Sequence, residues 1–333
     1  MDWPLPIRIL LLPLSWIYGF AVRAKTLCYS TGAIKQKRLN GAVVSIGNLT
    51  VGGTGKTPMV IWLAEKFLAE DKRVAILSRG YRGQQGTSDE IQLMKNRLGE
   101  RVRFGVGADR YTEGRKLEAA APVDIFLLDD GFQHLRLARD VDIVMLDGSK
   151  RLREEWLLPA GRLREPIRAC RRSDLLVVTR KFERPPIEAN DSHEHQLFYA
   201  QTRLLGFRKL GEQGTPDFLS EIGDGPYFMF CGIGNPEAFR SDLRRWHVSV
   251  AGTMHFRDHH RYSQTDASDL ESRAEQSGAV ALVTTEKDEQ NLQNVRFSRL
   301  PVYVVAIELV FSSESEFVPA LERILKERRS KTS

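Results

Sequence analysis

The run AVVSIGNLTVGGTGKTPMVIWLAEKFL at residues 42–68 decides the fold of this chain. Residues 42–46 form an apolar run, residues 50–57 are rich in glycine and end in Lys-Thr, and residues 59–68 have a helical pattern. A strand, a glycine-rich loop and a helix in this order predict a phosphate-binding loop, because successive backbone N–H groups of such a loop can point at phosphate oxygens.

The side chains of this loop fit the same reading. Lys56 is expected to reach the outer phosphates, and Thr57 can offer its hydroxyl to Mg²⁺. Thr50 stands where the usual motif has its first glycine, and Gly52 and Gly53 can supply the lost flexibility. An ordinary glycine-rich turn is the alternative, and the flanking strand and helix disfavour it. The predicted nucleotide-binding residues are Thr50, Val51, Gly52, Gly53, Thr54, Gly55, Lys56 and Thr57.

Length and apolar pattern predict two α/β lobes. The chain has 333 residues and 42% hydrophobic residues, which is enough for two cores. Strands are expected at 74–77, 124–128, 141–146 and 175–178, and again at 227–230, 248–250, 280–283 and 302–305, with a closing helix at 316–327. The expected parts are an N-terminal segment at 1–40, a P-loop NTPase-like parallel-sheet lobe at 41–200, linker strands at 201–225 and a smaller α/β lobe at 226–333.

Between the lobes, Pro185 and Pro186 and the polar run 188–196 are expected to form a surface excursion, followed by strand-like segments near 198–200 and 207–210. The three cysteines lie far apart with no C-x-x-C pair, which argues against a zinc site or a disulfide framework and favours a reducing cytoplasm.

The N-terminal segment is expected to be a membrane-associated helix. Residues 9–22 carry no charge and lie between Arg8 and Arg23. As a helix they would be about 21 Å long, shorter than the ~30 Å hydrocarbon core of a bilayer, and Pro13 would strain it. We expect an interfacial anchor; a spanning helix, a soluble helix packed on the body and a cleaved signal peptide are the alternatives.

The charges point to an anionic lipid surface as a partner. The net charge is +6, residues 1–40 hold six Lys or Arg against one Asp, and the last eight residues hold four against one Glu. The body between these ends is slightly acidic, so the basic excess is terminal and directed at a membrane rather than at a nucleic acid.

Two further segments carry candidate site residues. Asp129 and Asp130 follow a predicted strand, at the sheet edge where ligands of open α/β sheets bind, and one of them can hold Mg²⁺. His134 follows in the same loop, and a structural role is favoured over a catalytic one. In the charged segment 151–172, the LPAG frame at 158–161 indicates a constrained loop, and a guanidinium fork suits phosphate oxygens, so Arg164 and Glu165 are candidate site residues. A solvated charged face is the alternative.

Three histidines, His255, His259 and His260, precede a helix of the second lobe. A metal cluster lacks further ligands, so one histidine working with a carboxylate is the more economical reading. The GIGNP run at 232–236 lacks the glycine that a dinucleotide site needs, which disfavours NAD.

Together these motifs resemble the tetraacyldisaccharide 4′-kinase family, the lipid A kinases of the Gram-negative inner membrane. The matching motifs are GNLTVGGTGKTP at 47–58, SRGY at 78–81, SDE at 88–90, DDGFQH at 129–134, LPAG at 158–161 with RE at 164–165, FRDH at 256–259 and TEKD at 285–288.

The resemblance implies transfer of the ATP γ-phosphate to the 4′-hydroxyl of a tetraacylated glucosamine disaccharide 1-phosphate. It implies a glycolipid substrate, the cofactors ATP and Mg²⁺, and a monomer at the cytoplasmic face of the inner membrane. The implied catalytic residues are Asp89 as base, His259 as its support, Lys56, Arg110 and Arg164, and the implied metal site is Thr57, Asp129, Asp130 and Glu165. TEKD at 285–288 is a candidate for nucleotide contact.

If Asp89 and His259 lie on different lobes, the lobes must also close on the substrate to bring the two side chains together. Two rival functions remain at this point: a membrane-recruited switch ATPase of the partitioning type, whose signature Lys is Val51 here, and a nucleotide-gated scaffold without chemistry.

Overall fold

The computed structural model describes residues 4–80, 88–149, 152–180, 196–211, 222–223 and 225–331. Tyr81, Arg151 and the expected excursion around Pro185 and Pro186 lie outside these residues. The chain forms two compact units, and each is built from separated stretches. The first unit is Met1–Tyr81, Leu98–Gln201 and Leu309–Ser333, and the second is Arg82–Arg97 and Thr202–Glu308.

This division differs from the expected lobes in two places. Residues 82–97, expected in the first lobe, group with the second unit, and residues 309–333, expected in the second lobe, return to the first. The chain leaves and re-enters the first unit along two long strands, β7 (Gln196–Lys209) and β11 (Val302–Phe311), each of which contributes to both units. The two strand-like segments expected at 198–200 and 207–210 are parts of the single strand β7.

A parallel sheet forms the centre of the first unit, as expected. Its strand order is β3-β2-β4-β1-β5-β6-β7. The bounds are β1 Ala42–Asn48, β2 Val74–Ser78, β3 Arg103–Val106, β4 Ile125–Asp129, β5 Val141–Asp147 and β6 Leu175–Thr179. The register pairs Ile46 with Asp129 and Asn48 with Met145, so the ends of β1, β4 and β5 reach one edge together. β3 was not expected from the sequence, since it is short and half-polar.

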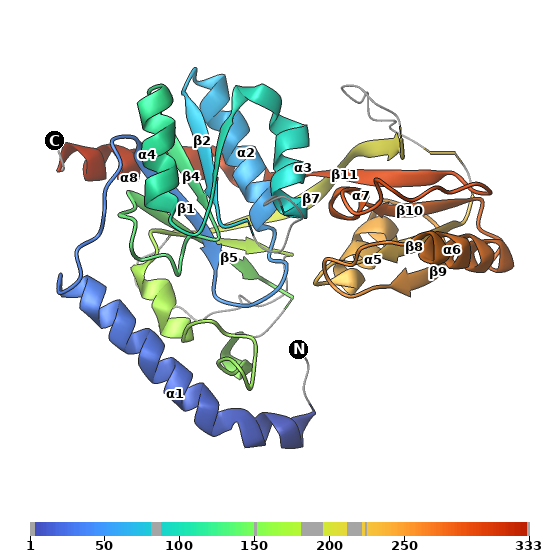
Figure 1. The fold of residues 1–333 in the computed structure, drawn as a ribbon, viewed down its shortest axis with the longest axis horizontal. Coiled ribbons are helices and arrows are strands. Elements are labelled where there is room, and N and C mark those ends of the chain that lie inside the picture. The colour runs from blue at the N-terminus through green and yellow to red at the C-terminus, as the bar shows by residue number, and fades with distance from the viewer. Residues whose placement is uncertain are drawn as a thin grey trace. The chain divides into compact units, whose positions relative to one another are not determined.

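Helices cover this sheet because its strands are buried on both faces. α2 (Lys56–Ala69) packs on β1 and β4, α4 (Arg110–Ala120) on β2 and β3, and α8 (Glu314–Ser330) on β5 (Figure 1). The strands are almost fully apolar, as expected for a doubly covered parallel sheet. The segment from Leu152 to Arg172 contains two short 3₁₀ turns and packs through Leu152, Leu163 and Cys170 on β5 and β6.

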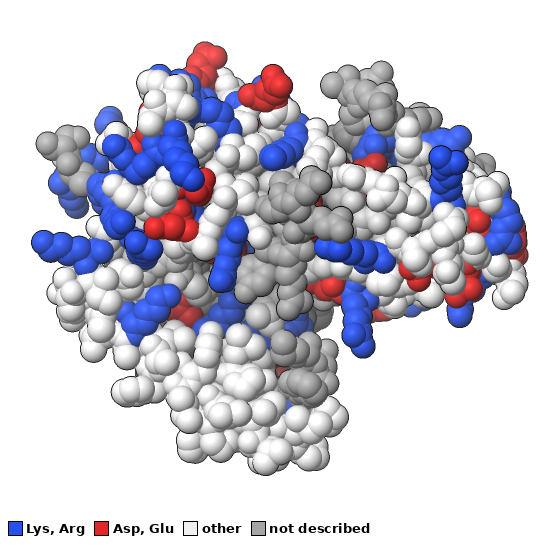
Figure 2. All heavy atoms as spheres, in the orientation of Figure 1, with Lys and Arg blue, Asp and Glu red and all other residues white. Residues whose placement is uncertain are grey.

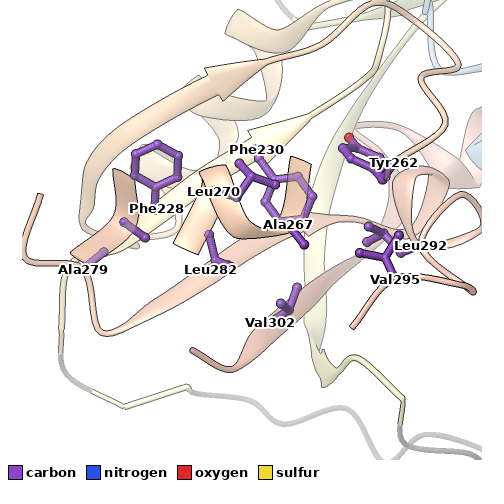
Figure 3. Close-up of a cluster of buried hydrophobic side chains, with 11 residues drawn as sticks. Phe228, Phe230, Tyr262, Ala267, Leu270, Ala279, Leu282, Leu292, Val295 and Val302 are labelled. Atoms are coloured by element: carbon purple, nitrogen blue, oxygen red, sulfur yellow. The ribbon is translucent and has the colours of Figure 1, made fainter. Parts of the chain in front are cut away.

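In the second unit the strand order continues as β7-β11-β10-β8-β9. Its remaining strands are β8 Tyr227–Cys231, β9 Val250–His255 and β10 Ala281–Thr285. Its helices are α3 Asp89–Leu98, α5 Pro236–Arg245, α6 Gln264–Gln276 and α7 Glu286–Glu289. Phe228 and Phe230 pack with Leu270 of α6 in the cluster of Figure 3, whereas Met229 packs with Phe239 of α5 in a second cluster. Successive residues of β8 thus pack into hydrophobic clusters on opposite faces of the sheet.

The N-terminal helix α1 (Leu5–Ser30) is longer than its uncharged core suggested. With 26 residues, the helix is long and apolar enough to cross a membrane, by length and composition. Pro13 lies inside the helix without ending it, and the ribbon bends towards its N-terminal end (Figure 1). The part of the surface formed by α1 is almost free of charge in Figure 2. Its exposed apolar side chains include Leu10, Trp16, Ile17 and Phe20.

Candidate active site

The phosphate loop lies between the end of β1 and the start of α2. Gly55 precedes α2 with a left-handed backbone (φ 85°), and Gly52 has φ 111°. Asn48 Nδ2 donates a hydrogen bond to Thr54 Oγ1 (3.1 Å), and Thr179 Oγ1 of β6 donates to Thr54 O (3.1 Å). Among the described residues, no side chain makes a capping hydrogen bond to α2. The first turn of a helix has N–H groups without intrahelical acceptors, so this fixed loop presents donors suited to a phosphate.

Lys56 and Arg164 converge on Asp130 beside the loop. Nζ of Lys56 is 3.6 Å from Asp130 Oδ1, and Nη1 of Arg164 is 2.7 Å from both carboxylate oxygens. Burial acts to raise the pKa of Asp130, but the charges of Lys56 and Arg164 outweigh it and hold the pKa below its usual value. Three of the residues expected at the site are therefore in contact, and Asp130 is ionised at neutral pH.

Asp129 and Thr57 supply oxygen donors next to this group. Asp129 ends β4, is buried and accepts a hydrogen bond from Ser78 Oγ (3.1 Å). Thr57 is the second residue of α2. Carboxylate and hydroxyl oxygens are the hard donors that Mg²⁺ prefers, and Mg²⁺ is usually held by one or two carboxylates together with phosphate oxygens and water. The residues present therefore fit Mg²⁺. Within the described residues, no group of three or more His, Cys, Asp or Glu side chains forms a metal cluster.

Glu165 was expected among the metal ligands, and the structure places it in an ion pair. Both of its carboxylate oxygens accept hydrogen bonds from Arg172, one of them at 2.7 Å. The same guanidinium lies 3.7 Å from the ring centroid of Phe132 and donates to Phe132 O (2.8 Å). Glu165 is buried, so Arg172 supplies the partner that a buried carboxylate requires.

Arg110 begins α4 and shares the electrostatic environment of the acidic strand end. Burial and Arg79 lower the pKa of Arg110, while Asp130 and Asp129 act in the opposite direction. Its Nη1 lies 3.4 Å from His134 Nδ1.

His134 is held uncharged by these surroundings. Burial, together with the charges of Arg110 and Arg139, lowers the pKa of His134 to about 4. A neutral imidazole in contact with Arg110 agrees with the structural reading of this histidine, as the sequence favoured.

Asp89 and His259 form a hydrogen-bonded pair in the second unit. Nδ1 of His259 lies 3.0 and 2.9 Å from the two oxygens of Asp89. Burial acts to raise the pKa of Asp89, but the hydrogen bond from His259 and the charge of Lys287 lower it below its usual value. The hydrogen bond to Asp89 raises the pKa of His259. The pair is therefore a carboxylate and an imidazole that each favour the other's charged form.

The expectation that this pair is divided between two lobes is wrong. Residues 82–97 belong to the same compact unit as His259. Arg97, at the other end of α3, makes two hydrogen bonds to Glu286 (2.8 and 3.0 Å) and donates to Ile307 O (2.7 Å). These part-buried contacts attach α3 to the second unit, so the argument for closure from a divided pair does not hold.

Lys287 was expected among possible nucleotide contacts, and in the structure its neighbours are acidic side chains of the second unit. Its Nζ lies 4.0 Å from Asp89, 3.9 Å from Glu90 and 2.9 Å from Asp258. Its position directly after β10 was the only available signal, because a contact with Asp89 depends on how α3 folds back.

The other two histidines have separate partners. Nε2 of His260 is 3.1 Å from Asp266, and His255 is 3.8 Å from Glu237.

Comparison with known proteins gives a consistent picture. Residues 7–326 match the family model described as tetraacyldisaccharide-1-P 4′-kinase. A tetraacyldisaccharide 4′-kinase of Geobacter metallireducens is 36% identical over 334 residues, covering 95% of this chain and 98% of the relative. One of Geobacter sulfurreducens is 36% identical over 93% of this chain and 91% of the relative. The crystal structure of the "apo" form of LpxK from Aquifex aeolicus in complex with ATP is 30% identical, has a TM-score of 0.74 and covers 96% of this chain and 99% of that one.

Proposed function

The chain belongs to the tetraacyldisaccharide-1-P 4′-kinase family, and from this premise we propose how its residues divide the reaction among them. It is an ATP-dependent kinase of lipid A biosynthesis that phosphorylates the 4′-hydroxyl of a tetraacylated glucosamine disaccharide 1-phosphate. Phosphoryl transfer requires positioning and charge neutralisation more than covalent catalysis.

The phosphate loop, residues 50–57, holds the triphosphate of ATP. The observation that carries this assignment is the meeting of Lys56 and Arg164 on the ionised Asp130 beside the start of α2. Two cations held by one carboxylate are positioned before the nucleotide arrives, so little reorganisation is needed when phosphate charge develops. Arg110 adds a third cation in the same electrostatic environment.

Thr57, Asp129 and Asp130 would hold Mg²⁺, which supplies neutralisation of the phosphate charge when bound. Glu165 is assigned an indirect role at this metal site, because its carboxylate pairs with Arg172. It fixes Arg172, and through Arg172 the backbone of Phe132 in the loop that follows Asp130. Glu165 is therefore proposed to support the metal site from this position.

Asp89 is proposed as the general base. The 4′-oxygen of the acceptor forms a bond to the γ-phosphorus, the hydroxyl proton passes to Asp89, and the bond between the γ-phosphorus and the bridging oxygen of ADP breaks. His259 holds Asp89 through Nδ1 and stabilises its charge. A base within a fixed hydrogen bond keeps one orientation towards its substrate.

The glycolipid substrate brings the enzyme to a membrane. We propose that α1 lies on the anionic cytoplasmic face of the inner membrane and that the protein acts there as a monomer. Support comes from the exposed apolar side chains of α1 and from the basic residues of the N-terminal segment.

The direct test of the function is transfer of labelled γ-phosphate from ATP to the disaccharide lipid in detergent micelles. Lys56→Ala should reduce turnover by ~10²-fold or more, because it removes a preorganised charge at the outer phosphates. Lys66→Ala is the matched control, since Lys66 lies on the same helix and pairs with Glu314 at the surface. Full turnover in Lys56→Ala would contradict the loop assignment.

The same assay separates the two rival functions. A switch ATPase of the partitioning type would dimerise with nucleotide and hydrolyse ATP without a lipid acceptor. A scaffold would tolerate loss of Asp89 and His259. Product formation that requires the disaccharide lipid excludes both.

A further inference from the structure

Ser15 is buried although many side chains of α1 are exposed. Nine large apolar side chains of this helix are exposed, yet Ser15 is only 2% exposed. Its Oγ donates a hydrogen bond to Leu157 O (3.0 Å) and accepts one from Ala160 N (3.1 Å). A buried hydroxyl that pairs with two backbone groups of another segment is a specific attachment. Leu157 O also accepts from Gly161 N (2.9 Å), whereas loss of the hydroxyl would take this acceptor from the N–H of the buried Ala160.

Tyr18, one turn further along, makes a second attachment to the same segment. Its hydroxyl donates to Arg164 O (2.9 Å). Burial raises the pKa of Tyr18 and Glu165 adds to this effect, so the hydroxyl keeps its proton and remains a donor. Arg8 contributes a third contact, with Nε donating to Ala160 O (3.1 Å). An added Cβ at Gly19 would lie 2.8 Å from Leu157, which shows how closely the helix approaches this segment.

The other side of this segment pairs with the phosphate loop. Arg164 N donates to Leu49 O (2.7 Å), and Val51 N donates to Arg162 O (2.9 Å). Nη2 of Arg162 donates back to Val51 O (3.0 Å), and Thr50 and Leu163 form an antiparallel bridge. Residues 157–164 are thus hydrogen-bonded to α1 on one side and to the loop on the other, and they carry the guanidinium that holds Asp130.

We propose that Ser15 and Tyr18 are positioning residues of the nucleotide site, which act through residues 157–164 to fix the phosphate loop and Arg164. This inference rests on the proposed function, since it assumes that the loop binds ATP. It assigns α1 two faces with different tasks. The exposed face carries Trp16 and Phe20 and meets lipid, whereas the face with Ser15 and Tyr18 sets the geometry at the phosphates.

The test compares variants on the two faces of α1. Ser15→Ala and Tyr18→Phe each remove one oxygen and leave the rest of the side chain in place. Each should raise both the KM for ATP and the dissociation constant for MgATP by about three- to ten-fold, the usual worth of one buried hydrogen bond. The KM for the disaccharide lipid and sedimentation with anionic vesicles should stay at the wild-type values.

Two controls lie on the same helix. Trp16→Ala, on the exposed face, should weaken sedimentation with vesicles and leave the dissociation constant for MgATP unchanged. Tyr29→Phe makes the same substitution as Tyr18→Phe about three turns further along and should change neither measurement. Equal melting temperatures of the variants show that the comparison is between folded proteins, and Tyr18→Phe alone suffices where Ser15→Ala is unstable.

The inference is overturned if folded Ser15→Ala and Tyr18→Phe bind MgATP as the wild type does. It is also overturned if Trp16→Ala weakens MgATP binding as much as they do, because α1 would then act only as an anchor or as a general stabiliser. Failure of the proposed function has a different signature, since the wild-type protein itself would then bind no MgATP.

Discussion

Asp89 keeps a negative charge although its side chain is only 5% exposed. Desolvation alone would favour the protonated acid, so the charge depends on its neighbours. His259 supplies a hydrogen bond, and Lys287 supplies a positive charge at 4.0 Å. Lys287 is itself held by Asp258 at 2.9 Å. The charge of this proposed base is therefore maintained by two partners, whose contributions can be separated by mutation.

The first prediction concerns Asp89 and His259 as one unit. Asp89→Ala and His259→Ala should each lower kcat by roughly 10²- to 10⁴-fold, the usual worth of general acid-base catalysis, with little change in ATP affinity. If His259 acts through Asp89, the double variant should be scarcely worse than the more damaging single variant. Steady-state kinetics on the four proteins measure this. Multiplicative losses would mean that the residues act independently, and the pair would have to be abandoned.

The second prediction concerns Lys287 and pH. Lys287 lowers the pKa of Asp89, so its removal must raise that pKa. A base with a higher pKa is protonated at a higher pH, and the acidic limb of the kcat/KM profile should therefore move to higher pH in Lys287→Met. Lys287→Arg keeps the charge among Asp89, Glu90 and Asp258 and is expected to keep the limb near its wild-type position. A limb that stays in place in Lys287→Met would exclude electrostatic control by this lysine.

At the scale of elements, the aromatic cluster around Phe317 decides where the C-terminal helix belongs. Phe317 of α8 lies against Phe311 (centroids 4.3 Å apart), Phe198 (5.0 Å) and Trp62 of α2 (5.7 Å). All four belong to the first unit. Burial of this ring draws α8 onto the first unit although the chain reaches it from the second.

The third prediction tests this attachment. Phe317→Ala leaves a cavity in a fully buried cluster and should cost about 3–5 kcal/mol, which lowers the unfolding midpoint of the first unit by on the order of 10 °C. Arg323→Ala on the exposed side of α8 is the control and should shift the midpoint little. Calorimetry measures the unfolding midpoint of both variants. An unchanged midpoint in Phe317→Ala would show that α8 contributes little to the first unit.

Local sequence patterns predicted the helices, strands and loops better than the side-chain contacts between them. The phosphate loop, the strands that flank it and the acidic end of β4 were predicted because each is encoded by neighbouring residues. The pairing of Arg172 with Glu165 and the approach of Lys287 to Asp89 were not predicted. Such contacts join elements whose relative position depends on the packing of the whole unit, and no local period encodes them.

The same limit explains why the boundaries of the two units were not predicted from the sequence. The apolar pattern of β11 predicted a strand at 302–305, but the strand runs to Phe311 and carries the chain from the second unit into the first. A boundary that falls within a continuous strand leaves no change of composition, and so the sequence offered no signal for it. The long strand β7 crosses in the opposite direction in the same way.

At the scale of the whole molecule, the surface of α1 is the most unusual feature. Trp16, Phe20 and Leu10 are each about three-quarters exposed, at 74%, 75% and 78%. Isolated exposed apolar residues are common on soluble proteins, but a continuous row along one helix marks a surface that binds protein or lipid. The surrounding basic residues and the glycolipid substrate favour lipid.

The last prediction follows from that surface. The protein should sediment with vesicles rich in anionic lipid and much less with zwitterionic vesicles, because the basic N-terminal segment adds electrostatic attraction to apolar burial. If α1 lies in the interface, high salt should weaken the electrostatic part and alkaline carbonate should release the protein. If α1 spans the bilayer, as its 26 residues permit, the protein should remain in the pellet through both treatments. Trp16→Ala should reduce binding in the first case through lost apolar area, whereas a spanning helix would tolerate the loss of one ring. Absence of sedimentation with either vesicle would contradict the membrane assignment of α1 and leave its exposed row to a protein partner.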